Sequence, residues 1–216
     1  MINFFLNLLF PIRCLGCRKK QEFICKDCLN KIPINNSHTK FKDSFLNGVI
    51  ASSDYNNLLI KQAIFKYKYE FAKELAKPLG LLMANAMAQQ FYPLTNIFLV
   101  PIPLHKKRLR WRGFNQAELL SKEISQQLNL PIADCLIRTK NTLPQMKINN
   151  AEKRRENIKN AFSLNTVPKA KIRIQDKTII LIDDVCSTGA TLEQCAKELK
   201  SLRPKEIWGF VLASGN

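Results

Sequence analysis

Two adjacent carboxylates followed by small hydroxyl-bearing residues form the part of the sequence best suited to chemistry. Asp183 and Asp184 come directly after the apolar, β-branched run 178–182, whose length is typical of a buried parallel strand. The sequence Ser-Thr-Gly-Ala-Thr follows at 187–191, and apolar residues recur at helical spacing from Leu192. This order predicts a strand, a tight loop and a helix. Because ligands bind at the carboxyl ends of parallel strands and helix N-termini attract anions, we expect a site for a sugar phosphate, with or without a metal ion, beside the two acids.

Four cysteines near the N-terminus form a second candidate site. They make two CxxC pairs separated by seven residues: Cys14, Cys17, Cys25 and Cys28. Four thiolates at that spacing can surround zinc in a closed tetrahedral site, which predicts a structural role. An iron–sulfur centre is the main alternative. Two disulfides would also satisfy the spacing, but no feature of the sequence indicates the oxidising compartment that they require.

The chain is strongly basic. Lysine and arginine number 34 against 17 acidic residues, which gives a net charge of +17. This excess predicts polyanionic partners. The alternative is that the protein comes from an organism whose proteins are generally rich in lysine. The densest stretch, LHKKRLRWRGFNQ at 104–116, follows an apolar run of strand length. Such a cluster of charged residues usually lies on a solvent-exposed face. This one follows a predicted strand, so it would lie at the same edge of the sheet as the two acids. The residues predicted there to bind a diphosphate or a nucleic-acid backbone are Lys106, Lys107, Arg108, Arg110, Trp111 and Arg112.

Two further segments carry cations. The segment RTKNTLPQMKINNAEKRRENIKNAF at 138–162 predicts a flexible loop that could close over a charged substrate. The loop residues expected to contact that substrate are Lys140, Lys153, Arg154 and Arg155. At 66–69 the sequence Lys-Tyr-Lys-Tyr alternates cation and aromatic ring, and we favour an amphipathic turn there over a stacking platform for nucleic acid.

The rest of the sequence predicts alternating strands and helices. Apolar runs of strand length occur at 48–52, 97–103, 135–138 and 207–213, and helical spacing occurs within 55–90 and from Asn115. The first 14 residues lack the basic segment and the cleavage site of a signal peptide. We therefore expect a short helix there instead of an export signal. No stretch reaches the roughly 20 apolar residues that span a bilayer. We therefore expect a soluble, cytoplasmic protein without a membrane span.

Four of these motifs occur in the order found in the ComF family of competence and DNA-uptake proteins, which the chain resembles over nearly its whole length. They are the paired CxxC motifs, VPIPLHKKRLRWRGFNQAELL, RTKNTLPQ and IILIDDVCSTGATL. The last motif also resembles the phosphoribosyl-diphosphate motif of type I phosphoribosyltransferases. The resemblance implies an α/β fold, a type I phosphoribosyltransferase-like parallel sheet flanked by helices over 46–216. It also implies a small N-terminal zinc module built on the four cysteines, which with the first helix occupies 1–32.

The resemblance also assigns roles to the acidic motif. In the related enzymes the two acids hold the ribose hydroxyls and help to position Mg²⁺, and the amides of the following loop hold the 5′-phosphate. By resemblance, these roles fall on Asp183, Asp184, Ser187, Thr188, Gly189, Ala190 and Thr191.

Two kinds of function are consistent with these residues. In the first, the protein is an enzyme, and Mg²⁺ with the cations of 106–112 stabilises a diphosphate that leaves C1′ of the ribose. In the second, the pocket binds phosphoribosyl diphosphate or a related ribose phosphate, and the basic surface binds single-stranded DNA. Other proteins of the DNA-uptake machinery could be further partners. We favour the second. We expect no base-recognition hood after the last strand, so no acceptor is assigned, and a nucleotide-salvage enzyme with an incidental basic surface stays an alternative.

Overall fold

The structure is a computed structural model that describes residues 11–35, 38–144, 148, 150–165 and 174–215. The short helix expected in the first 14 residues falls mainly on 1–10, outside the described residues, and stays a prediction. Among the helices of the described part, none combines the length and the apolar character that a membrane span requires.

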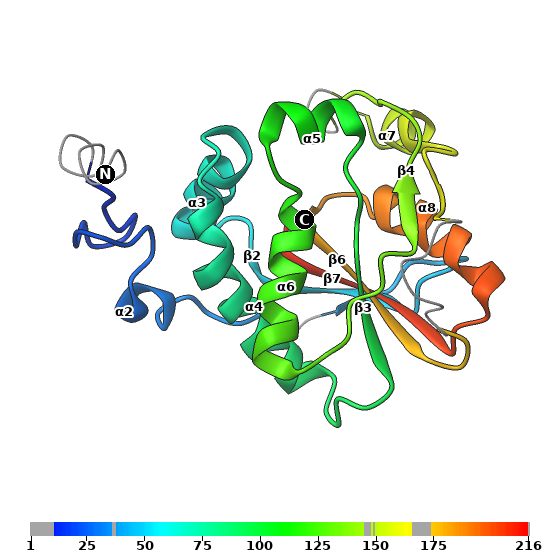
Figure 1. Ribbon diagram of the computed structural model, residues 1–216, viewed down its shortest axis with the longest axis horizontal. Helices are drawn as coiled ribbons and strands as arrows, with labels where there is room; N and C mark the ends of the chain where they lie inside the picture. The colour runs from blue at the N-terminus through cyan, green and yellow to red at the C-terminus, as the bar shows by residue number, and fades with distance from the viewer. Residues whose placement is uncertain (1–10, 36–37, 145–147, 149, 166–173, 216) are drawn as a thin grey trace.

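A mostly parallel five-stranded sheet forms the centre of the molecule (Figure 1). The strand order is β1-β2-β7-β6-β3, with β1 antiparallel at one edge and the other four strands parallel. The strand bounds are β1 His38–Thr39, β2 Gly48–Asp54, β3 Ile97–Pro101, β6 Thr178–Cys186 and β7 Glu206–Ser214. The runs predicted at 48–52, 97–103 and 207–213 therefore form strands of this sheet.

Helices cover both faces of the sheet, so the chain has three layers (Figure 1). The first face carries α3 (Leu58–Tyr69), α4 (Ala76–Gln90) and α6 (Gln116–Leu128), and the second carries α7 (Ala151–Ile158) and α8 (Ala190–Leu199). Successive side chains of β6 point to opposite faces of the sheet. Ile180 and Ile182 therefore pack in the hydrophobic core of the first face, and Ile179 and Leu181 pack in that of the second. The expected fold, a parallel sheet flanked by helices, is confirmed.

The run at 135–138 does not join the parallel sheet. It forms β4 (Leu136–Arg138), which pairs antiparallel with β5 (Phe162–Leu164) in a separate two-stranded sheet. The outer edge of β3 is already occupied, because Leu99 N–H donates to the Pro131 carbonyl at 2.9 Å and Ala133 N–H donates to the Leu99 carbonyl at 2.8 Å. The chain must therefore leave the sheet before it reaches β4.

Local capping explains where the helices begin and end. Side chains of Asn57, Asn115 and Asn150 accept hydrogen bonds from N–H groups in the first turns of α3, α6 and α7. Gly113 and Asn129, with φ of 82° and 52°, end α5 (Lys106–Arg112) and α6 in the left-handed region. These caps fix the residues at which the helices begin and end.

The cysteine-rich module packs against the helices of the first face. It contains the short helix α2 (Lys26–Leu29), and its buried residues Cys14, Ile24, Leu29 and Ile32 share one hydrophobic core with α3 and α4. The proposed division of the chain into 1–32 and 46–216 stays a prediction.

Candidate functional site

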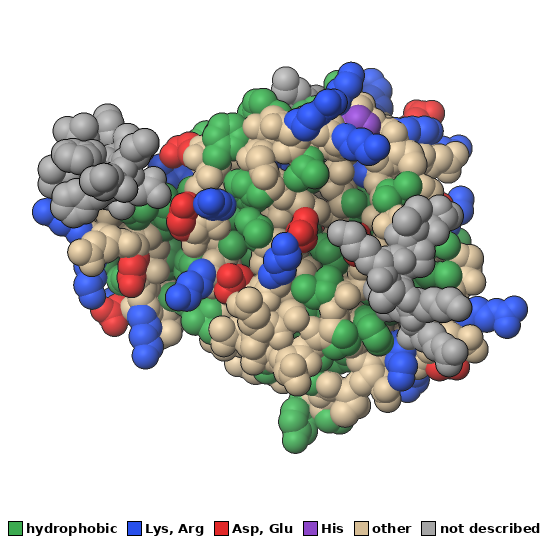
Figure 2. All heavy atoms as spheres, in the orientation of Figure 1, with side chains coloured by type: hydrophobic (Ala, Val, Ile, Leu, Met, Phe, Trp, Pro, Cys, Tyr) green, Lys and Arg blue, Asp and Glu red, His purple; other side chains and the backbone are tan. Residues whose placement is uncertain are grey.

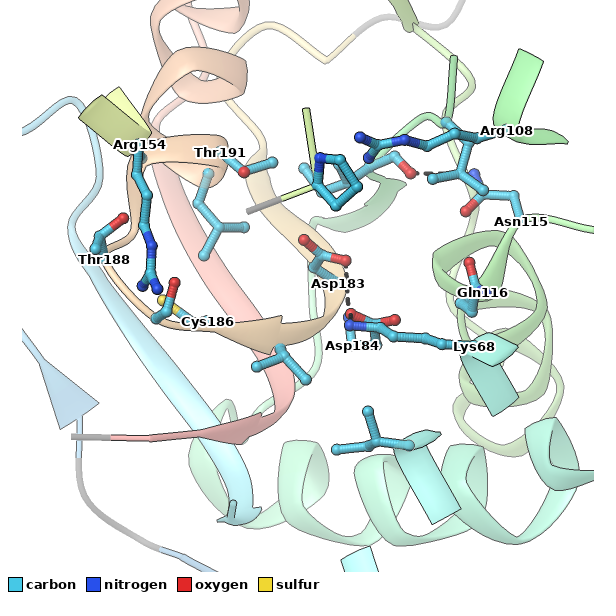
Figure 3. A pocket seen from close by; sticks show the side chains of 18 of the residues that line it. Lys68, Arg108, Asn115, Gln116, Arg154, Asp183, Asp184, Cys186, Thr188 and Thr191 are labelled. Carbon is cyan, nitrogen blue, oxygen red and sulfur yellow. Dashed lines mark hydrogen bonds and ion pairs between the residues drawn. The ribbon is translucent and has the colours of Figure 1, made fainter. Parts of the chain in front are cut away.

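A cleft of about 720 Å³ opens at the carboxyl edge of the sheet (Figure 3). Its walls come from α3, α5, α6, the end of β6 and the start of α8. All seven residues predicted to contact the ribose and its phosphate line it: Asp183, Asp184, Ser187, Thr188, Gly189, Ala190 and Thr191. The structure thus brings the acidic motif together with the first turn of α8 at one site.

The two acids lie within β6, which continues to Cys186, whereas we expected them at the C-terminal end of the strand. β3 pairs with β6 only as far as Ile182, while β7 continues to pair with it through Cys186. The extra pairing with β7 extends the strand past the acids. On the β3 side, Asp183 and Asp184 lie beyond the last pair and face the cleft.

The acids point to opposite faces of the sheet. Asp184 follows the alternation of Ile182 and faces the helices of the first face, and Asp183 faces the second. Lys68, in the last turn of α3, forms an ion pair with Asp184 at 2.7 Å from Nζ to Oδ1. Lys68 was missed by the sequence analysis. The only signal was its place in the Lys-Tyr-Lys-Tyr turn, which is indeed helical and amphipathic.

Asp183 is the acid without an ion-pair partner among the described residues. Its Oδ1 accepts the N–H of Asp184 at 2.8 Å. Desolvation, and then the neighbouring Asp184 charge, raise the pKa of Asp183 to about 7, although Lys68 and Arg138 act in the opposite direction. A carboxyl group with a raised pKa in a cleft gains most from a cation or hydroxyl group brought by a ligand.

The loop after β6 is shaped to receive an anion. Gly189 caps α8 with φ of 72°, and a Cβ there would lie 2.9 Å from the ring of Phe41. Ala190 and Thr191 belong to the first turn of α8, where backbone N–H groups have no partner within the helix. Glu193 is held by Ser44 and by the N–H of Phe45, so the segment before β2 braces this end of the helix.

Of the residues that the structure describes, five cationic side chains line the cleft against two carboxylates: Lys68, Arg108, Arg112, Arg138 and Arg154. Figure 3 places Arg154 beside Thr188 at one end and Arg108 beside Asn115 at the other, with the acids between them. Within the described residues, the buried Nε atoms of Arg112 and Arg138 have no hydrogen-bond partner. Desolvation, and then the charge of Arg108, lower the pKa of Arg138 to about 10. Crowded guanidinium groups, two of which have an unpartnered Nε, favour an anionic ligand at this wall.

The stretch expected as a basic loop is helix α5. His105 Nδ1 accepts the N–H of Lys107 at its start, and Gly113 ends it. The helix divides the cations between two faces. Arg108 and Arg112, four residues apart, line the cleft together with Trp111, while Lys106, Lys107 and Arg110 are exposed and are not among the lining residues. Figure 2 shows Lys and Arg side chains gathered at the top of the view, over α5.

The expected lid is partly helical. Lys153, Arg154 and Arg155 lie in α7, because the side chain of Asn150 caps its first turn. Only Arg154 of the four predicted lid residues lines the cleft, and its Nε donates to the Ile148 carbonyl at 2.7 Å. Lys140 instead donates to the Lys159 carbonyl at 3.2 Å.

Exposed aromatic rings border the mouth of the cleft. Phe71 and Trp111 pack edge to face with ring centroids 5.1 Å apart, and Phe65 and Tyr69 pack at 5.3 Å. All four rings are more than a third exposed. Exposed rings beside arginines are typical of surfaces that stack bases.

The four predicted cysteines converge on one point. The sulfur atoms of Cys14, Cys17, Cys25 and Cys28 all lie within 4.8 Å of one another. Burial opposes ionisation of the Cys14 thiol, but the backbone N–H groups of Cys17, Cys25 and Gly16 outweigh it and lower the pKa of Cys14 to about 6. This donor set fits a metal ion such as zinc, held by protein groups alone.

Known proteins resemble the chain in sequence. The phosphoribosyl transferase domain family matches residues 114–216. Competence protein F of Haemophilus influenzae is 32% identical over 211 residues, which cover 93% of this chain and 90% of that protein. The DNA utilization protein YhgH of Escherichia coli K12 is 28% identical and covers 86% of this chain and 82% of that protein. Competence protein ComFC of Bacillus subtilis is 28% identical and covers 85% of this chain and 70% of that protein.

A solved structure, that of the AQ2163 protein from Aquifex aeolicus, also resembles the chain. It has 16% sequence identity and a TM-score of 0.44, and the overlap covers 77% of this chain and 86% of that one.

Proposed function

The chain belongs to the ComF family of competence proteins, and on that premise we propose that it serves DNA uptake by binding a ribose phosphate and single-stranded DNA. The ribose phosphate is phosphoribosyl diphosphate or a related compound. The observation that carries the proposal is the order of groups along the cleft, in which two cationic ends flank a pair of carboxylates. That order matches a sugar with a phosphate at one end and a diphosphate at the other.

Each part of the ligand has a matching wall. The 5′-phosphate would accept hydrogen bonds from the N–H groups at the start of α8 and from Arg154. The ribose hydroxyls would lie at Asp183, and the diphosphate would face Arg108 and Arg112. One guanidinium group can donate two parallel hydrogen bonds to two oxygens of a phosphate, so these two arginines suit a diphosphate better than lysines would.

We expect Mg²⁺ to enter with the diphosphate. Asp183 offers the hard oxygen ligand that Mg²⁺ prefers, and this carboxylate faces the cleft. When bound, Mg²⁺ would neutralise charge on the diphosphate oxygens. Zinc would hold the cysteine-rich module in shape and take no part in the chemistry of the cleft.

Single-stranded DNA would lie along the outer face of α5 and extend to the exposed aromatic rings at the mouth of the cleft. Lys106, Lys107 and Arg110 supply phosphate contacts there, and Trp111 with Phe71 supplies a surface for stacking bases. The net charge of +17 would attract such a polyanion.

Phosphoribosyl transfer is the second candidate function. The wall of Arg108, Arg112 and Arg138 is placed to stabilise the charge of a departing diphosphate. A binding protein would use the same wall to hold an intact diphosphate. Release of pyrophosphate therefore separates the two candidates.

A matched pair of variants on α5 tests the proposal. Calorimetric titration with phosphoribosyl diphosphate and Mg²⁺ should show binding that Arg108→Ala weakens by about tenfold or more, because a charged hydrogen bond is lost. Arg110→Ala, on the outer face of the same helix, should leave that affinity unchanged and weaken binding of single-stranded DNA. Equal effects of the two variants on the ribose phosphate would contradict this placement, and pyrophosphate release on adding the ligand would favour the enzyme.

A further inference from the structure

The ion pair between Lys68 and Asp184 sits at the floor of the cleft. The side chains of Lys68 and Asp184 are 18% and 8% exposed, and Nζ lies 2.7 Å from Oδ1. Burial opposes the charge of Lys68, but the Asp184 carboxylate outweighs it and raises the pKa of Lys68. The ammonium group therefore stays charged at neutral pH.

The fold holds this ammonium group in place. Tyr67, the preceding residue, is fully buried, and its hydroxyl donates to the Gln116 carbonyl at 3.2 Å. Its ring packs on Phe114 with centroids 5.4 Å apart. These contacts fasten the end of α3 to the start of α6, so Lys68 cannot leave Asp184 by a simple movement of its helix.

A bound ammonium group changes what Asp184 can do. A carboxylate in contact with one cation attracts a second cation weakly, because the two positive charges repel each other at short range. Asp184 is thus neutralised by the protein, while Asp183 has no ion-pair partner among the described residues. The two adjacent acids are not equivalent.

We propose that Lys68 takes at Asp184 the place that a divalent cation would otherwise take, so that the ribose end of the site binds its ligand without metal. Mg²⁺ is then needed only when the ligand carries a diphosphate, and Asp183 is the carboxylate open to it. This inference rests on the proposed function, because it concerns the same ribose phosphate. Lys68 acts as a positioning residue, which holds the Asp184 carboxylate through the ion pair and orients it toward the sugar.

Ribose 5-phosphate is the probe that isolates the ribose end, because it has no diphosphate. Its affinity for the natural chain, measured by calorimetry in buffer freed of Mg²⁺ without a chelator and in millimolar Mg²⁺, should differ by less than about twofold. Lys68→Met should weaken binding in the Mg²⁺-free buffer by about tenfold or more, because Asp184 is left as an unpaired buried charge, and Mg²⁺ should restore much of the loss. Binding of Mn²⁺ to Lys68→Met without any sugar, measured by electron paramagnetic resonance, should rise in parallel.

Lys66 provides the matched control. It lies on the same helix and forms an ion pair with Glu70 at the surface, so Lys66→Met should change neither the affinity nor its dependence on metal. Lys68→Gln can still donate a hydrogen bond to Asp184 and serves as a second uncharged variant if Lys68→Met does not fold. It should show the same dependence on Mg²⁺.

The outcomes separate this inference from the proposed function. If the natural chain binds ribose 5-phosphate only with Mg²⁺, or if Mg²⁺ restores no binding to a folded Lys68 variant, the role of Lys68 is overturned and the proposed function stands. If the natural chain binds neither ribose 5-phosphate nor phosphoribosyl diphosphate under any condition, the proposed function fails and this inference fails with it.

Discussion

Asp183→Asn should make the protein more stable above neutral pH. The carboxyl group is half-buried, and desolvation with the adjacent Asp184 charge raises its pKa from 3.8 to about 7. A carboxyl group whose pKa is higher in the folded state binds its proton more tightly there, so its stabilising contribution is full below about pH 4. That contribution is lost as the pH rises to about 7, where the folded protein must ionise the group.

The shift sets an upper limit on the effect. A shift of roughly 3 pKa units corresponds to about 4 kcal/mol of unfolding free energy above pH 7. Because the cleft admits water and Asp183 is only half-buried, we expect about 1–2 kcal/mol. Asn has nearly the same shape, and its side-chain oxygen can still accept the Asp184 N–H, so the substitution removes the charge and little else.

Urea denaturation of the natural chain and of Asp183→Asn, in EDTA-free buffer without Mg²⁺, measures this effect. The stability advantage of the variant should grow from about pH 5 to about pH 8, and comparison at equal pH cancels the common effect of acid on the cysteine module. Asp134→Asn, at an exposed position, should show no such growth. An advantage of Asp183→Asn that stays constant across this pH range would refute the reasoning. The same variant should bind phosphoribosyl diphosphate more weakly, because it loses the charge that faces the ribose.

Three further predictions concern other parts of the chain. Cys25→Ser should lose the bound metal, measured by elemental analysis. Its folding free energy should fall by several of the roughly 10 kcal/mol that such modules gain from zinc, and a variant that keeps zinc and parental stability would contradict this. Gly189→Ala should cost about 2–3 kcal/mol, because φ is 72° and the new Cβ would lie 2.9 Å from Phe41, and should weaken phosphate binding. Gly113→Ala, with φ of 82° but nothing within 4 Å, should cost only about 1 kcal/mol in the same thermal denaturation, and equal costs would argue against the contact with Phe41. Trp111→Ala should weaken binding of single-stranded DNA by about 1–3 kcal/mol in fluorescence anisotropy without changing its salt dependence, because stacking releases no counterions; a changed slope would contradict a stacking role.

The sequence by itself determined the parts of the site whose residues are neighbours in the chain. The β-branched run, the two acids and the small residues at 187–191 specify a strand, a turn and a helix through local periodicity and backbone freedom. The two CxxC pairs likewise bring four thiols together within a short span, and the structure places their sulfur atoms within 4.8 Å of one another. Both features could be predicted because each depends on residues that lie close together in the chain.

The ends of the elements were less predictable. β6 continues past the acids because β7 extends further than β3 does, and this pairing belongs to the sheet rather than to the acidic motif. The basic stretch at 106–112 forms a helix because His105 and Gly113 cap it, although its apolar content is too low to show helical spacing. Arg108 and Arg112 then face the cleft while Arg110 faces solvent, a division that a loop would not impose.

Only the tertiary structure decided which distant charges meet. Lys68 reaches Asp184 because Tyr67 fastens α3 to α6 and the sheet brings β6 alongside them. Arg138 and Arg154 reach the same cleft from the far side of the sheet. Ion pairs of this kind join residues far apart in the chain, and no local pattern encodes them. A cation on an amphipathic helix has the same sequence signature whether it faces water, as Lys66 does, or a buried carboxylate, as Lys68 does, because the packing of the helices alone sets the difference.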